Sequence, residues 1–232
     1  MPDYLYALVP AGTQAPTEPG IEGRPVSSWI LDEALAVLRS EIDGTTVQPR
    51  RRHLIAHDRV LAAAMAAGPV LPLRFAAITE AGPEVVLEEL DRTAALERMQ
   101  RLDGKVEVHL IWAPDERTAL RRAARTYPQV RDRGLAAVER GRLVADALTE
   151  VAVDDLTAVI TQVHSLLVTT GPVESRGRSA RVAMLVEFDG LETLLATCGE
   201  LADRVAAAGT LRTVGGLPPY SFASLDEDLV GG

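Results

Sequence analysis

The chain has 232 residues, of which 47% are hydrophobic and 25% charged, the usual proportions of a soluble globular protein that can bury one large core or two small ones. Its formal net charge of -9 argues against a general nucleic-acid-binding protein, because neutralising phosphates requires a basic surface. No apolar run is long enough to cross a bilayer and the first residues do not resemble a signal peptide, so we expect a cytoplasmic protein.

The first half of the chain alternates predicted strands with predicted helices. Apolar residues at every second position indicate strands, and apolar residues three and four apart indicate amphipathic helices. The stretch 33–36 is also compatible with a helix. The predicted strands cover residues 4–9, 26–30, 36–42, 70–78 and 106–110, and the predicted helices cover residues 51–66 and 83–103. This order predicts a ferredoxin-like α+β layer, an antiparallel sheet with its helices packed on one face.

The second half begins with a helix at Pro114 and continues into a long amphipathic helix over residues 131–163. Two strands, a further helix and a final pair of short strands are predicted after it, at residues 166–170, 182–188, 190–208, 211–214 and 220–222. The predicted fold class is therefore α+β in two small domains, residues 1–113 and residues 114–232. We expect the long helix to join the two α+β units, and the acidic tail after Leu225 to be disordered.

Two short segments combine prolines with a scarce aromatic residue. Residues 69–75 have the sequence Pro-Val-Leu-Pro-Leu-Arg-Phe and residues 217–222 have the sequence Leu-Pro-Pro-Tyr-Ser-Phe, and together they hold two of the three phenylalanines. Proline fixes φ and removes a backbone donor, so both segments are predicted to be rigid packing sites. We expect Leu71, Leu73 and Phe75 to fill the N-terminal core. We expect the second segment to be extended and to pack against the C-terminal sheet.

Arg74 places a charge inside an apolar strand, next to Phe75. The favoured interpretation is a buried or half-buried arginine that pairs with a carboxylate such as Glu107. The alternative is an anchor for a partner protein, because arginine and aromatic residues are frequent at interface hot spots. The candidate structural or partner-binding residues are Arg74, Phe75, Pro218, Pro219, Tyr220 and Phe222.

Four motifs, in this order along the chain, resemble those of the gas vesicle accessory proteins of the F/L family. They are Tyr4-Leu5-Tyr6-Ala7-Leu8-Val9, then His57-Asp58-Arg59-Val60-Leu61 with the segment 69–75, then Leu102-Asp103-Gly104-Lys105-Val106-Glu107, and finally Pro-Pro-Tyr-Ser-Phe at 218–222. The chain departs from the family in a short, diverged stretch over residues 10–42. It also has Gly215-Gly216-Leu217-Pro218 where the family has Gly-Pro-Trp.

The resemblance implies an accessory or minor structural protein of gas vesicles, the gas-filled, protein-walled organelles that give some prokaryotes buoyancy. It implies the hydrophobic shell subunit and other accessory proteins as partners during nucleation or growth of the shell. A soluble acidic protein can cover the apolar surface of such a subunit before assembly. The expected location is the cytoplasm and the gas vesicle.

No constellation of catalytic residues is recognisable. His53 and His57 share a helix face without a suitably spaced third ligand, so a solvated or capping pair is favoured over a zinc site. Cys198 is expected to be a small core residue rather than a nucleophile. Phosphate-binding and nucleophile motifs are missing, so we expect no enzyme activity, no cofactor and no metal. The alternative function is a ferredoxin-like small-ligand-binding domain or enzyme, with an inter-domain pocket that uses Arg74, His109 or His57.

Two basic clusters interrupt the acidic composition, at residues 50–52 and at Arg176, Arg178 and Arg181. Contact with an acidic partner protein is one interpretation of both clusters. A solvated surface patch is the favoured one.

Overall fold

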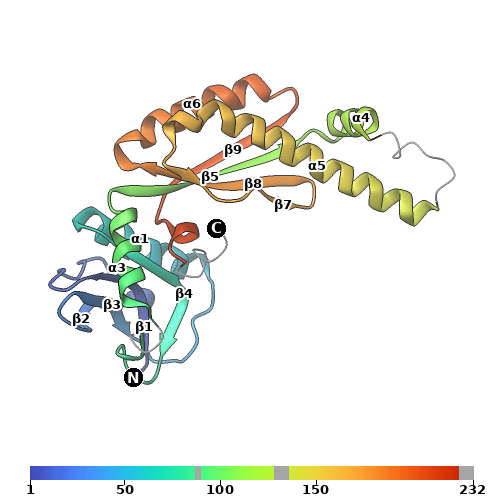
Figure 1. The fold of residues 1–232 in the computed structure, drawn as a ribbon. Helices are drawn as coiled ribbons and strands as arrows, with labels where there is room; N and C mark the ends of the chain where they lie inside the picture. The colour runs from blue at the N-terminus through green and yellow to red at the C-terminus, as the bar shows by residue number, and fades with distance from the viewer. Residues whose placement is uncertain (87–89, 128–135, 225–232) are drawn as a thin grey trace. The chain divides into compact units, whose positions relative to one another are not determined.

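The computed structural model of the chain describes residues 1–86, 90–127 and 136–224 (Figure 1). These residues form two compact units. The first unit contains Met1–Val106 together with the chain from Leu217, and the second contains Glu107–Gly216. The division expected from the sequence, between residues 113 and 114, differs from this one mainly because the chain returns to the first unit after Gly216. The acidic tail after Leu225 lies outside the described residues.

The first unit is built on a four-stranded sheet. Its strands are β1 (Asp3–Pro10), β2 (Ser27–Ile30), β3 (Leu35–Glu41) and β4 (Leu71–Thr79), in the spatial order β2-β3-β1-β4. All three neighbouring pairs are antiparallel, as predicted. A ferredoxin-like unit has a helix between its first two strands. Here that connection holds the 3-10 turn η1 (Ile21–Gly23), because residues 10–25 are rich in proline and glycine.

Both faces of this sheet are buried. On one face, Tyr4 and Tyr6 of β1 share a hydrophobic core with Val60 and Leu61 of helix α1 (Arg51–Ala67). Apolar residues outside that core, Leu5, Leu8, Leu35 and Val37, are also buried, and so are Ala95, Met99 and Leu102 of helix α3 (Arg92–Leu102). The prediction that the helices cover one face is therefore wrong. Burial on both sides explains why β1 is apolar at successive positions rather than strictly alternating.

Helix α3 begins later than its sequence pattern suggested. The side chain of Asp91 accepts a hydrogen bond from the backbone N–H of Ala94 at 3.0 Å and so caps the first turn. Residues 85 and 86, close to the predicted start at Pro83, are also helical, residues 87–89 lie outside the described part of the chain, and α3 itself starts after Asp91.

The second unit has a five-stranded sheet in the order β6-β8-β5-β9, with β7 also paired to β8. Its strands are β5 (Lys105–Pro114), β6 (Thr169–Thr170), β7 (Glu174–Arg176), β8 (Ser179–Glu187) and β9 (Gly209–Leu217). The predicted polar loop over residues 171–180 contains β7. Most of the predicted strand 166–170 is instead the 3-10 turn η3 (His164–Leu166) and a connection to β6.

Three described helices accompany this sheet, α4 (Glu116–Thr126), α5 (Ala137–Val163) and α6 (Leu191–Val205), and α6 follows the 3-10 turn η4 (Phe188–Gly190). Helix α5 belongs to the second unit and does not join the two units, so the expected linker role is wrong. It packs against β8 and α6, and its residues Leu156 and Val159 are buried. The start expected at residue 131 lies outside the described residues.

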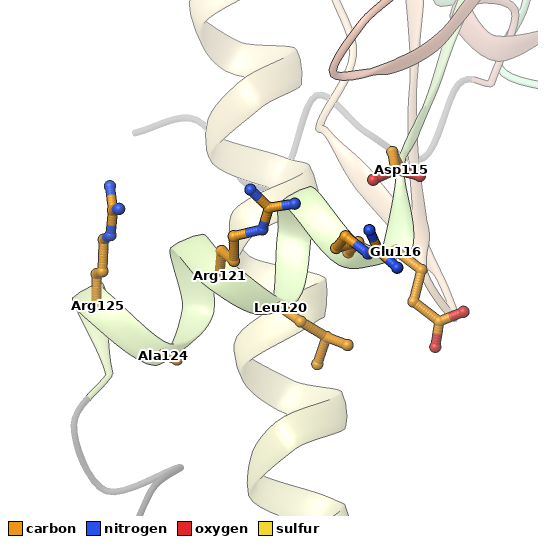
Figure 2. Close-up of a pocket in the computed structure, with 7 residues that line it drawn as sticks. Asp115, Glu116, Leu120, Arg121, Ala124 and Arg125 are labelled. Atoms are coloured by element: carbon orange, nitrogen blue, oxygen red, sulfur yellow. The ribbon is translucent and has the colours of Figure 1, made fainter.

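Helices α4 and α5 pack against each other through a small apolar core, and α4 crosses α5 at a large angle (Figure 2). Ala119 and Ala123 of α4 are buried against Ala147, Leu148 and Val151 of α5. The guanidinium of Arg122 and the indole N–H of Trp112 both donate to the carboxylate of Asp155 in α5.

The mixed α+β fold with antiparallel sheets is as predicted. No helix within residues 1–86, 90–127 and 136–224 combines the length and apolar character that a membrane span requires.

Candidate functional site

Strand β4 carries a wide bulge opposite Tyr6. In the pairing of β1 with β4, Leu5 lies opposite Ala77 and Ala7 lies opposite Pro72. One residue of β1 therefore faces a stretch of four in β4, residues 73–76. Ala76 has a φ of +65°, a left-handed conformation that an alanine adopts at an energetic cost. The backbone N–H of Ala76 donates to the hydroxyl of Tyr4 at 3.1 Å, which holds the bulge against the core.

The bulge turns the Phe75 side chain toward the core. Its ring lies 6.1 Å from the ring of Tyr4 and 5.7 Å from the ring of His57, in edge-to-face geometry with both. Leu71 is buried as expected, whereas Leu73 and Phe75 are half-buried. The segment therefore seals the margin of the N-terminal core and does not fill its centre.

Arg74 points out of the core and is exposed. Among the described residues no carboxylate pairs with it. The predicted partner, Glu107, instead accepts a hydrogen bond from Nε2 of His109 at 2.5 Å. The favoured prediction of a buried ion pair is wrong, because the bulge reverses the side on which residue 74 would emerge from a regular strand.

His57 is the centre of an aromatic cluster under the bulge. The hydroxyl of Tyr4 donates to its Nδ1 at 2.9 Å, and its ring stacks on Tyr6 on one side and on Tyr220 on the other. Burial lowers the pKa of His57 to about 4, although the charge of Asp58 and the carbonyl of Leu73 favour the protonated ring. The imidazole is therefore neutral at pH 7.

The two histidines are not solvated, contrary to the prediction, because both are buried. His53 does not cap α1 either, because its Nδ1 donates to the carbonyl of Gln48 at 2.9 Å and the start of the helix has no side-chain cap. The two rings bind different partners, so they do not form a pair of metal ligands that face one site. Within the described ranges, no three His, Cys, Asp or Glu side chains gather as a metal site would require.

The C-terminal proline segment completes this cluster. The hydroxyl of Tyr220 donates to Oδ1 of Asp58 at 2.8 Å, a contact between residues 162 positions apart. Pro218 and Pro219 are buried, Phe222 is half-buried, and the carbonyl of Phe222 accepts from the Arg98 guanidinium at 3.2 Å. Residues 220–222 form the 3-10 turn η5 and belong to the first unit. The prediction of an extended segment on the C-terminal sheet is wrong on both counts.

The structure thus brings together three of the four sequence motifs: the strand at 4–9, the helix at 57–61 with the proline segment 69–75, and the C-terminal proline segment. The central role of His57 was missed, although its place inside a motif was a signal. Burial of the neutral ring between aromatic side chains offers a substrate no access. The arrangement instead fixes the β4 bulge and presents Arg74 to the outside.

We call this set the bulge site, meaning residues 73–76 with His57, Asp58, Tyr220 and the two prolines before it.

Comparisons with known proteins identify the family of the chain. A model of the gas vesicle synthesis protein GvpL/GvpF family matches residues 3–224. Gas vesicle protein F of Streptomyces sp. (strain CB03234) is 33% identical over 96% of this chain and 99% of its own length. Gas vesicle protein F of Nostoc sp. (strain PCC 7120) is 34% identical over 47% of each chain.

Two crystal structures have the same fold. GvpF from Microcystis aeruginosa matches with a TM-score of 0.76 over 96% of this chain and 99% of that one, at 20% identity. GvpF from Anabaena sp. PCC7120 matches with a TM-score of 0.72 over 96% of both chains, at 21% identity. At these identities the two structures show the shared fold alone.

Proposed function

Because this chain belongs to the GvpL/GvpF family of gas vesicle synthesis proteins, it takes part in gas vesicle formation, and we propose that it acts there as an accessory or minor structural protein. In this role it binds the hydrophobic shell subunit and other accessory proteins, works without catalysing a reaction, and is located in the cytoplasm and at the vesicle. The single observation that carries the proposal is the bulge site, which combines a rigid support with an exposed arginine.

The bulge site has the properties of a protein-binding surface. Arg74 is exposed and lacks a carboxylate partner in the described part of the chain, so its five donors are available to a partner. The strained backbone at Ala76 and the rings beneath it hold the segment in one conformation. Preorganisation of this kind reduces the entropy lost when a complex forms. Arginine beside an aromatic residue is a common composition of interface hot spots.

An accessory role also suits the overall composition. A strongly apolar shell subunit has to be kept from aggregating before it enters the growing wall, and a partner with a net charge of -9 stays soluble while covering it. The neutral, inaccessible His57 serves this role better than a catalytic one, because it supports the bulge without reacting.

The first prediction concerns Arg74. We expect Arg74→Ala to weaken co-purification with reconstituted shell subunit by at least about tenfold, because a central interface arginine contributes on the order of 2 kcal/mol. The measurement is the amount of shell subunit retained by tagged full-length chain, at several concentrations. Arg51→Ala is the matched control, since Arg51 is an exposed arginine of the same unit outside the bulge site.

Equal retention by the wild-type chain and by Arg74→Ala would exclude Arg74 as an anchor. Loss of retention in both arginine variants would indicate a general effect of charge. Thermal unfolding of each variant, measured alongside, separates lost binding from lost folding.

A further inference from the structure

Helix α4 has two opposite faces of different character. Ala119 and Ala123 are buried against α5, while Arg117, Arg121 and Arg125 are exposed. Residues four apart lie on the same side of a helix, so these arginines form a row along it, which we call the α4 arginine row. Figure 2 shows Arg121 and Arg125 pointing to one side of the helix, with Leu120 and Ala124 toward the other.

A hollow of about 700 Å³ runs along this outer face, lined by the arginine row, Leu120, Ala124 and the two acidic residues at the start of the helix. All of its lining comes from α4 and its N-cap residue. The hollow is therefore an open depression along one helix, and it would not enclose a small molecule. Its shape suits an elongated partner that lies along α4.

Three carboxylates that lie at the start of α4 or pair with one of its side chains are already engaged. Asp155 pairs with Arg122, Glu116 pairs with Arg178 at 2.6 Å, and Asp115 accepts the backbone N–H of Thr118 as the helix cap. In the described part of the chain, none of the three arginines of the row forms an ion pair. In a chain where acidic residues outnumber basic ones by nine, three such arginines side by side are complementary to external carboxylates.

We propose that the α4 arginine row docks an acidic helical segment of a partner protein. The segment would carry Asp or Glu at positions i, i+4 and i+8, with an apolar residue alongside this row that contacts Leu120 in the lining of the hollow. Successive arginines of the row are about 6 Å apart along the helix axis, and carboxylates at the same spacing on a second helix have the same rise. Rows of residues four apart are also the ridges by which helices pack together.

A membrane surface fits the α4 arginine row less well. Helices that lie in the interface bury a broad face of large apolar residues. The outer face of α4 offers Leu120, which is 37% exposed, and the small Ala124.

This inference is independent of the proposed function. It concerns the second unit, whereas the bulge site lies in the first, and its test needs no shell subunit. Failure of the Arg74 experiment would leave it intact.

The test uses the full chain and a synthetic helical peptide with Glu at three positions four apart and Leu between them. We expect the wild-type chain to bind this peptide with an affinity that falls as salt is raised. The triple variant Arg117→Glu, Arg121→Glu, Arg125→Glu should bind at least about tenfold more weakly, since three exposed ion pairs of about twofold each are lost and repulsion is added. A photo-crosslinker on the peptide should label residues of α4.

The matched control is Arg142→Glu, Arg204→Glu, Arg212→Glu, which changes the net charge equally at exposed arginines elsewhere in the same unit and should bind like the wild type. A peptide with Lys in place of Glu should prefer the triple variant over the wild type. Circular dichroism shows whether each variant is folded. If the Glu variants do not fold, Gln replacements at the same three positions take their place, and they are expected to weaken binding less.

Four results would overturn the proposal. The first is equal binding of the Glu peptide by the wild type and by the triple variant of the row. The second is an equal loss of peptide binding in that variant and in the control variant. The third is that the wild type does not prefer the Glu peptide over the Lys peptide. The fourth is loss of binding to phosphatidylserine vesicles, or loss of self-association, in the triple variant while the Glu peptide fails to bind the wild type.

Discussion

At the residue scale, His57 determines how the first unit is held together. It contacts side chains from β1, β4 and the C-terminal segment, and its ring is neutral because burial lowers its pKa. A protonated imidazole in this position would lose the hydrogen bond accepted from Tyr4 and would carry an unsolvated charge. The stability of the first unit therefore depends on the protonation state of one ring.

The second prediction follows from this dependence. The folded state binds a proton at His57 only below about pH 4, whereas the unfolded chain does so near its ordinary pKa of 6.5. Between these values the unfolded state holds more protons, so stability should fall as the pH is lowered from 6.5 toward 4, by about 3 kcal/mol in total. Urea unfolding midpoints at a series of pH values measure this loss.

His57→Gln should be less stable at pH 7.5 but should lose less stability on acidification than the wild type. His164→Gln is the matched control, because His164 is exposed, and should follow the wild-type curve. Parallel curves for the wild type and His57→Gln would show that another group governs the acid dependence.

The residue scale is also where sequence reasoning was weakest. The candidate set included Phe75 and Tyr220 because scarce aromatics beside prolines indicate fixed packing. The partner that they share, His57, could not be identified, since its contacts come from strands and turns up to 162 residues away. The orientation of Arg74 was predicted for a regular strand, and the bulge invalidated that prediction.

At the scale of elements, the patterns of alternating and helical apolar residues gave most strands and helices of the first unit with small errors at their ends. They failed where local chemistry overrides periodicity. Asp91 caps a separate helix start within the single helix predicted over residues 83–103, and the register shift in β4 has no signature in the apolar run from Leu71 to Ile78. A bulge requires knowledge of the neighbouring strand, which a single sequence does not supply.

The third prediction tests whether the bulge stores strain. Ala76→Gly should be neutral or stabilising, because glycine adopts a positive φ freely, while Ala77→Gly should cost about 0.5 to 1 kcal/mol in a regular strand position paired with Leu5. The difference between the two variants in free energy of unfolding should be about 1 to 2 kcal/mol. Chemical denaturation of both variants measures it.

Equal destabilisation by the two glycines would show that Ala76 is unstrained. The shell-subunit retention assay adds a second readout on these variants. A bulge that is preorganised for binding should retain less shell subunit when Ala76 is replaced by the more flexible glycine, even if the fold is unchanged.

At the scale of the whole molecule, the chain leaves the first unit at Val106 and returns to it at Leu217. Sequence reasoning predicted rigid packing sites at both proline segments and assigned the second one to the wrong unit. Proximity along the chain favoured the C-terminal sheet, whereas the contact of Tyr220 with Asp58 joins elements from opposite ends of the sequence. Long-range pairings of this kind are not encoded in local composition.

The fourth prediction is that removal of the returning segment weakens the first unit selectively. A chain ending at Gly216 loses the Tyr220 stack on His57 and the Arg98 contact, so amides of α1 and β4 should lose protection from hydrogen exchange. Amides of α6 and β8 should keep theirs. Vesicle production should also fail in a host that carries the other assembly genes.

A chain ending at Ser224 is the control, because it keeps Tyr220 and Phe222, whose contacts with Asp58 and Arg98 join the segment to α1 and α3. It should match the full chain in protection and in vesicle production. Normal protection of α1 and β4 in the chain ending at Gly216 would show that the returning segment is dispensable for the first unit.

The return of the chain also sets an order of events during translation. The 110 residues from Glu107 to Gly216 must be synthesised before Tyr220 can reach His57, which takes roughly 5 to 20 s at ordinary elongation rates. Throughout that interval the nascent first unit has its aromatic cluster open on one side, exposed to chaperones and to early-binding partners. The bulge site therefore reaches its final form only after the second unit and Tyr220 have been translated. Truncated products that end before Tyr220 cannot form it.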